Sequence, residues 1–130
     1  MFYYTDLNRR GVYFGMKFDY MCRDKICSTI EVEHDKVKVT DYVDNFNYKA
    51  FGMRKNITIE DVEDFLEDRC VPRTRANINE ILAIKGYPGY MPLLILRDTH
   101  GVLCEDEFWI RFEGETLTWD DVKIKGWHKS

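Results

Sequence analysis

The sequence lacks the short motifs by which phosphate-binding loops, dinucleotide-binding folds and zinc hydrolases are recognised. It contains no G-x-x-x-x-G-K-[ST], no G-x-G-x-x-G and no H-E-x-x-H segment,. No set of residues supplies a nucleophile, a base and a charge-stabilising group together,. We therefore expect no enzyme activity, no cofactor and no metal ion.

Long apolar runs and an export signal are also missing. No stretch approaches the ~18–20 apolar residues that are needed to span a bilayer. Residues 1–6 show no basic start followed by an apolar run, so we expect no signal peptide,. These features predict a cytoplasmic protein without a membrane segment.

The four cysteines, Cys22, Cys27, Cys70 and Cys104, are scattered, and none forms a C-x-x-C pair. In a chain without an export signal they are expected to be reduced thiols. A zinc site built from Cys22, Cys27 and His34 is the alternative. Its spacing is unusual, and its fourth ligand would have to come from a distant segment.

An excess of positive charge is absent, because 19 Lys and Arg residues face 23 Asp and Glu residues and the net charge is −4. A nucleic-acid backbone would repel such a chain as a whole. Aromatic residues, by contrast, make up 15% of the chain. Rings fill small cores and are also enriched at binding surfaces. The 130 residues predict one domain, residues 1–130, because no linker or repeat divides them,.

The first half of the chain is predicted to form β-strands. Residues 12–18 are rich in strand-forming types,. Residues 25–33 and 36–43 each alternate between apolar and polar side chains, and His34 and Asp35 form a short polar link between them. This pattern predicts an antiparallel hairpin with one face on the core. The core faces are predicted to carry Ile26, Ile30 and Val32 on the first strand, and Val37, Val39, Asp41 and Val43 on the second.

The second half changes to helical spacing at Thr58, which predicts helices near 59–69 and 75–85,. Thr58 can cap the first helix in a box with Asp61. Pro72 ends that helix, because the residue before a proline is forced out of the α region.

The second helix is predicted to begin at a Thr74 cap and to end at Lys85-Gly86,. A third short helix begins at Pro92, residues 108–112 form a strand, and Thr118 caps a last helical turn,. The expected fold class is α+β, with an antiparallel sheet from the N-terminal half and two to three short helices from the C-terminal half.

Acidic residues surround the apolar stripe of the first predicted helix, and a second acidic group precedes the predicted strand at Trp109. Charge without a catalytic set indicates recognition by electrostatic complementarity. We predict that a partner binds a surface that consists of Glu60, Glu63, Asp64, Glu67, Glu105, Asp106, Glu107 and Trp109.

Arg69, Arg73 and Arg75 form a basic group around Pro72. Guanidinium groups can hold phosphate or carboxylate by paired hydrogen bonds. The alternative is pairing inside the molecule with Glu67, Asp68 and the acids at 105–107. The abundance of acids and the negative net charge favour this internal, structural role.

His100, Cys104 and Asp106 include the residue types of a nucleophile, base and acid set,. Proximity along the chain is weak support, because working triads are assembled in space. The alternative places His100 at a helix C-terminus, where a cation is favoured, and Cys104 in the core.

An ordered set of short motifs spans residues 58 to 124. It comprises Phe65-Leu66-Glu67-Asp68-Arg69, Pro72, Arg75, Ile81-Leu82, Tyr90, Pro92-Leu93, Thr99, Gly101, Asp106, Phe108-Trp109-Ile110, Trp119 and Asp121-Val122. This set resembles a non-catalytic module of small accessory proteins from Firmicutes and their mobile elements. The same module precedes the kinase in some HipA-type toxin proteins. The resemblance implies an accessory or regulatory protein, not a phosphotransferase.

Two functions follow as hypotheses. In the first, a phage or mobile element encodes the chain, which binds and inhibits a host protein or nucleoprotein with a basic surface, such as a CRISPR-type nuclease. In the second, the chain is a regulatory or antitoxin-like partner of a HipA-type kinase. DNA binding would be an additional part of this role and would use helices 58–69 and 74–85. Pro72 in the link and the near absence of basic side chains in the second helix argue against binding to DNA,.

Overall fold

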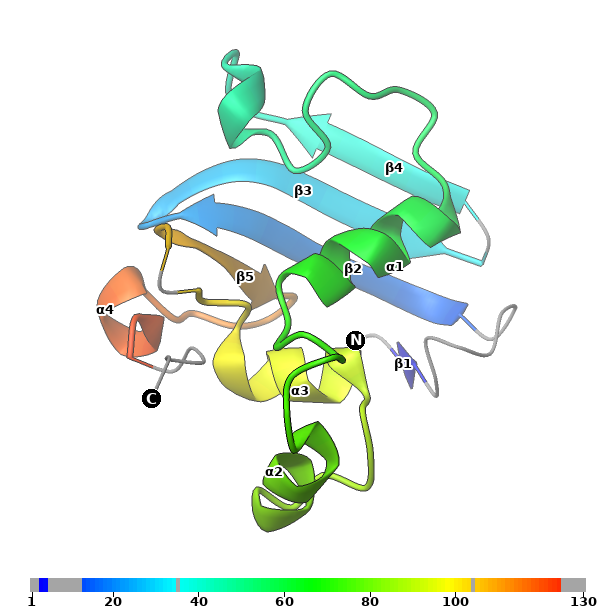
Figure 1. Cartoon of the computed structure of the whole chain (residues 1–130). Helices are drawn as coiled ribbons and strands as arrows, with labels where there is room; N and C mark the ends of the chain where they lie inside the picture. Colours follow the sequence, from blue (N-terminus) through cyan, green and yellow to red (C-terminus); the bar gives the residue numbers. More distant parts are fainter. Residues whose placement is uncertain (1–2, 5–12, 35, 104, 125–130) are drawn as a thin grey trace.

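An antiparallel β-sheet with most of its helices packed on one face and the last helix on the other forms the framework of the computed structural model (Figure 1). The structure describes residues 3–4, 13–34, 36–103 and 105–124. The strands are β1 (Tyr3–Tyr4), β2 (Tyr13–Cys22), β3 (Lys25–Glu33), β4 (Lys36–Asp41) and β5 (Phe108–Phe112). The helices are the 3-10 turn η1 (Phe46–Tyr48), α1 (Ile59–Asp68), α2 (Ile78–Ile84), α3 (Pro92–Thr99) and α4 (Trp119–Val122). The predicted α+β class is confirmed.

Strand β2 lies at the centre of the sheet. It pairs antiparallel with β3 along one edge, and with β1 and β5 along the other. β4 continues the sheet on the far side of β3, as the predicted hairpin requires. The strand predicted at residues 12–18 is longer than expected and runs to Cys22, because Arg23 and Asp24 turn the chain directly into β3. Arg23 has φ 51°, the left-handed conformation that tight hairpin turns use,.

A β-bulge at Cys27 changes which residues of β3 face the core. Tyr20 pairs with Ser28 and Met21 pairs with Ile26, so Cys27 is the extra residue on its strand,. Cys27 therefore joins the main core, whereas Ile26 packs on the second cluster, formed by Met21, Val102, Trp109 and Val122. The predicted face of Ile26 was wrong for this reason.

The apolar residues at the other predicted core positions of the hairpin agree with their alternation, whereas Asp41, predicted on the same face, is exposed. Ile30 and Val32 are buried, and Val37, Val39 and Val43 pack against the same cluster. β4 ends at Asp41, two residues earlier than predicted. The Ser28 hydroxyl donates to the Asp41 carboxylate at 2.7 Å and accepts from the Ala50 amide at 3.1 Å. These bonds hold the loop that follows β4 against the end of the strand.

Helix α1 lies across the core face of the sheet (Figure 1). Thr58 and Asp61 form the predicted capping box,. Val62, Phe65 and Leu66 are buried. The Phe65 ring meets the Tyr20 ring edge-on, with centroids 5.1 Å apart. The apolar stripe of the helix therefore packs on the sheet, and its acidic side remains outside.

The second helix starts later than the sequence predicts. α2 begins at Ile78, and its cap is Asn77, with φ 59°, not Thr74. The Arg75 amide donates to the Pro72 carbonyl and the Ile78 amide to the Arg75 carbonyl, both at 3.1 Å. These two tight turns occupy the residues that were predicted as the first helical turn.

Helices α3 and α4 begin at the residues that the sequence predicts. Pro92 occupies the first turn of α3, which ends at His100 with φ 56° and Gly101 with φ 68°. Thr118 and Asp121 form a capping box on α4. In the described part of the chain, no helix is long and apolar enough to cross a membrane.

Candidate functional site

Arg69 is an internal residue of the fold. Its side chain is buried, and its Nε donates to the Gly101 carbonyl at 3.0 Å. Its two terminal nitrogens donate to the two carboxylate oxygens of Asp106 at 2.9 and 3.0 Å, and one of them also donates to the Phe108 carbonyl at 2.7 Å. Burial raises the pKa of Asp106, but the bonds from Arg69 and from the Phe108 amide hold it below its ordinary value. Arg69 therefore pairs with an acid inside the molecule, as the structural alternative predicted, and Asp106, which was predicted to bind a partner, holds the fold together instead.

Arg73 lies on the surface and pairs with Glu67 at 2.8 Å. Its guanidinium also stands over the Tyr90 ring, 4.4 Å from the centroid,. The Tyr90 hydroxyl donates to the Val71 carbonyl at 2.6 Å. Arg75 is half-buried. Glu67 is therefore partly neutralised by Arg73, although both side chains face solvent.

The acidic face of α1 consists of Glu60, Glu63, Asp64, Glu67 and Asp68. Glu63 is half-buried, and the other four are exposed. Although the residue is exposed, partial loss of solvent around its carboxyl group raises the pKa of Asp68 above its ordinary value, and the nearby carboxylates of Asp64 and Glu67 raise it further. Like charges are thus concentrated at the C-terminal end of the helix, where the helix dipole also disfavours them. A cation supplied from outside would relieve this repulsion.

The second predicted acidic group is divided between the surface and the interior. Glu105 and Glu107 are exposed, and Glu107 forms an ion pair with Arg23. Trp109 is fully buried, and its indole nitrogen donates to the Arg23 carbonyl at 2.6 Å. The prediction that Trp109 is part of the binding surface was wrong, because the ring fills the second core cluster.

Three aromatic rings are exposed on the loop that follows β4. Tyr42, Phe46 and Tyr48 are 56%, 50% and 43% exposed, and we refer to them as the aromatic rim. The binding surface predicted from the sequence did not include these rings. For Phe46 and Tyr48 the available signal was their occurrence in a turn-rich segment with neither strand nor helix period, where no core face can receive them. For Tyr42 the signal was its place on the outer face of the alternating segment 36–43,.

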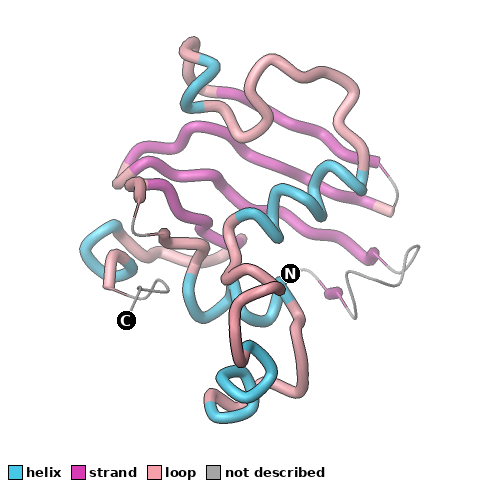
Figure 2. The backbone as a smooth tube through the Cα atoms, in the orientation of Figure 1, coloured by secondary structure: helices cyan, strands magenta, loops and turns pink. Residues whose placement is uncertain are grey.

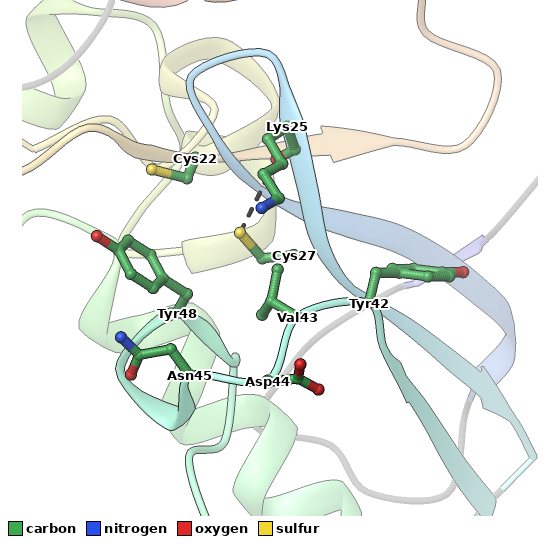
Figure 3. Close-up of a pocket in the computed structure, with 8 residues that line it drawn as sticks. All are labelled: Cys22, Lys25, Cys27, Tyr42, Val43, Asp44, Asn45 and Tyr48. Carbon is green, nitrogen blue, oxygen red and sulfur yellow. Dashed lines mark hydrogen bonds between the residues drawn. The ribbon is translucent and has the colours of Figure 1, made fainter.

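The aromatic rim borders an open pocket of about 530 Å³ (Figure 3). Asn45 caps η1 by accepting the Asn47 amide on its side-chain oxygen at 3.0 Å, which fixes the loop. Burial is the main cause that raises the pKa of both thiols in the pocket. The pocket is lined by Cys22, Lys25, Cys27, Tyr42, Val43, Asp44, Asn45 and Tyr48.

Tyr48 of the rim lies on the side of the sheet that α1 covers, because its ring contacts Phe108, which packs against the main core. Figure 2 shows the loop after β4 running beside α1. A series of ring contacts connects Tyr48 to α1. The Tyr48 ring is tilted against Phe108 with centroids 5.8 Å apart, Phe108 stacks on Tyr20 with centroids 4.8 Å apart, and Tyr20 meets Phe65 of α1 edge-on. Phe51, on the same loop, contacts Phe65 at 5.3 Å. One rigid framework therefore supports the exposed rings and the exposed carboxylates.

The possible catalytic triad does not form among the residues that the structure describes. His100 is buried, and its Nε2 lies 3.0 Å from a carboxylate oxygen of Glu115. Within the described residues, its Nδ1 has no hydrogen-bond partner. Asp106 is bonded to Arg69, and Cys104 lies outside the described residues. Burial raises the pKa of Glu115, but the bonds from His100 and the Phe112 amide hold it below its ordinary value.

The proposed zinc ligands are likewise separated. Cys22 and Cys27 line the same pocket, whereas His34 lies at the opposite end of β3. Among the residues that the structure describes, no three potential metal ligands are grouped.

The helix pair considered for DNA binding does not form a helix-turn-helix. α1 packs against α3, residues 69–77 separate it from α2, and α2 contains neither Lys nor Arg. A recognition helix needs side chains that reach the bases and phosphates of a groove. The geometry therefore offers this alternative no support.

No family model, no curated protein and no solved structure matches the chain. The resemblance of residues 58–124 to the accessory and HipA-associated module stays a prediction.

Proposed function

We propose that the chain is a non-catalytic protein-binding module, and that a partner with a basic surface binds the acidic face of α1 together with the aromatic rim. One observation carries the proposal: a chain of contacting rings connects the exposed Tyr48 of the rim to α1, which carries the exposed carboxylates. Exposed groups of large apolar side chains next to charged ones are typical of interaction sites.

The two parts of the surface supply different contributions. Aromatic rings provide most of the contact area that determines how slowly a complex dissociates. Carboxylates attract a basic partner and orient it, which mainly raises the association rate. A lysine or arginine placed between Asp64 and Asp68 would also relieve the repulsion that raises the pKa of Asp68,.

We further propose that the partner is a host macromolecular machine, such as a CRISPR-type defence nuclease, which the chain inhibits, and that a phage or mobile element encodes the chain. The support is the resemblance of residues 58–124 to accessory proteins of mobile elements. Carboxylates on a helix can also compete with phosphates for a basic nucleic-acid channel.

The experiment is affinity capture from a host lysate with three forms of the protein. The wild type is compared with Asp64→Lys/Asp68→Lys and with Glu33→Lys/Asp120→Lys. The last pair makes the same change in net charge at exposed positions away from the acidic face. The proposal predicts a salt-sensitive partner that the first double variant loses and the control retains. Equal capture by all three would overturn it, and recovery of a HipA-type kinase would identify the partner as that toxin.

A further inference from the structure

The pocket under the aromatic rim carries opposite charges on opposite sides. Lys25, the first residue of β3, contributes an ammonium, and Asp44, on the loop after β4, contributes a carboxylate. Figure 3 shows Lys25 on the side of the two thiols and the Asp44 carboxylate on the other side of Val43. Both side chains are exposed, and no described residue forms an ion pair with either.

The Lys25 ammonium lies close enough to the two cysteines to lower the pKa of both thiols. Burial raises the pKa of Cys27, and the Lys25 ammonium acts in the opposite direction. The same holds for Cys22, where the neighbouring Glu107 and Arg23 also contribute. A charge that acts on both thiols stands close to the side of the pocket that they form.

The surface between the two charges is apolar and aromatic. Val43 and Cys27 form its base, both packed against the main core, and the Tyr48 ring forms one wall. The side-chain oxygen of Asn45 is occupied by the Asn47 amide, so the Asn45 NH₂ group is the part left to donate to a ligand,. A ligand that fits has an apolar centre, an anionic end and a cationic end.

Size narrows the class of ligand. A volume of about 530 Å³ lies within the range of ligand pockets, about 300–1,000 Å³, and exceeds what one side chain fills,. Alternate residues of an extended peptide point to the same side. Positions i, i+2 and i+4 of such a peptide can therefore enter one pocket together.

We propose that this pocket binds a short extended segment of the partner, in which an apolar residue lies between an acidic residue and a basic residue at positions i, i+2 and i+4. The acidic residue pairs with Lys25, the apolar residue packs between Val43 and Tyr48, and the basic residue pairs with Asp44. This inference rests on the proposed function, because it names the chemistry of the partner segment.

The test uses three acetylated and amidated peptides that differ only in their charged residues: Glu-Gly-Phe-Gly-Arg, Arg-Gly-Phe-Gly-Arg and Glu-Gly-Phe-Gly-Glu. Binding is followed by changes in the amide NMR signals of Lys25, Val43 and Asn45. The wild type is expected to prefer the mixed-charge peptide about two- to fivefold over the other two, as for solvent-exposed ion pairs.

Two single variants give the matched specificity test. Lys25→Glu makes both sides of the pocket acidic and should shift the preference to the doubly basic peptide. Asp44→Lys makes both sides basic and should shift it to the doubly acidic peptide. Both residues are exposed, so the fold tolerates either change,.

Equal affinity of the wild type for all three peptides would overturn the inference, as would signal changes confined to other parts of the molecule. Asp64→Lys/Asp68→Lys separates this result from the proposed function. That variant should keep the peptide preference while it loses the partner. If it loses the partner and the peptides still show no preference, the proposed function stands and the pocket inference fails.

Discussion

Arg69 and Asp106 lie 37 residues apart in the sequence and form a two-pronged ion pair, with N–O distances of 2.9 and 3.0 Å. The same guanidinium donates to the backbone carbonyls of Gly101 and Phe108. It thereby ties the end of α1 to the end of α3 and to the start of β5. The acidic face and the rings beneath the rim are held in place partly by this one side chain.

Replacement of Arg69 by Ala should lower the free energy of unfolding by about 3 kcal/mol, because it removes the cationic partner of the Asp106 carboxylate and the guanidinium donor of two backbone carbonyls,. Arg73→Ala is the matched control. Its ion pair with Glu67 is exposed, so the loss should stay below about 1 kcal/mol,. Urea unfolding of both variants measures the difference, and equal losses would contradict the structural role of Arg69.

Gly101→Ala should destabilise the fold more than Gly114→Ala. Both glycines have positive φ, 68° and 86°, so alanine is strained at either position,. Only at Gly101 would a new Cβ meet neighbours, the Arg69 Cβ at 3.1 Å and the Ile110 Cδ1 at 3.3 Å. We expect the overpacking to cost about 1–3 kcal/mol beyond the backbone strain. Thermal unfolding of the pair tests this, and a larger loss for Gly114→Ala would refute it.

The bond between Glu115 and His100 predicts a loss of stability in acid. The pKa of Glu115 in the folded protein lies below its ordinary value of 4.5. Stability from this group is therefore present above that value and is lost as the pH falls through the folded pKa.

In Glu115→Gln, which cannot ionise at this position, the decline of unfolding free energy with falling pH should be shallower than in the wild type. Glu33→Gln, at an exposed position, serves as the control and should follow the wild-type slope. Denaturant unfolding at several pH values measures the slopes. Identical slopes for the wild type and Glu115→Gln would exclude this contribution.

The order in which the cysteines react with a thiol reagent should follow the solvent exposure of their side chains. Cys22 is half-buried, whereas Cys70 is buried, and burial raises the pKa of its thiol to about 11. Because the thiolate is the reactive form, maleimide should modify Cys22 before Cys27 and Cys70. Peptide mapping by mass spectrometry reports the order. Early labelling of Cys70 would show that α1 and the link after it open readily.

Local signals in the sequence predicted most of the fold. Thr58 with Asp61 marks the start of α1, Pro92 marks α3, and the alternation of 36–43 marks β4. One error arises where a single residue departs from the regular pattern. The bulge at Cys27 reverses the face of Ile26, and no periodicity reveals an extra residue on one strand,.

Less of the candidate site than of the fold could be predicted from the sequence. The acidic face follows from helical spacing alone, because the apolar stripe of α1 fixes which side is outside,. The burial of Trp109 depends on packing with Met21 and α4 and on the Arg23 carbonyl, which lies 86 residues away in the sequence. The pocket brings the β2–β3 turn next to the loop after β4, and only the three-dimensional fold shows this juxtaposition.

Binding to the partner should weaken as the pH falls, because protonation removes the carboxylates that attract it. The pKa of Asp68 is raised by burial and by its acidic neighbours, so Asp68 loses its charge before an ordinary carboxyl group does. Asp68→Asn should reduce the affinity at neutral pH and flatten this pH dependence. Titration of the captured partner at several pH values tests both effects, and an unchanged profile in Asp68→Asn would exclude Asp68 from the interface.

The most direct test of the binding surface is the affinity of the captured partner for Asp64→Lys/Asp68→Lys, measured beside Glu33→Lys/Asp120→Lys. The melting temperatures of both variants should stay close to that of the wild type, because exposed charges contribute little to stability. The account predicts that the first variant loses at least about tenfold in affinity, as expected for close charge pairs at an interface, while the control keeps its affinity. Equal affinity of the two variants, with both folded, would contradict the acidic face of α1 as the binding surface.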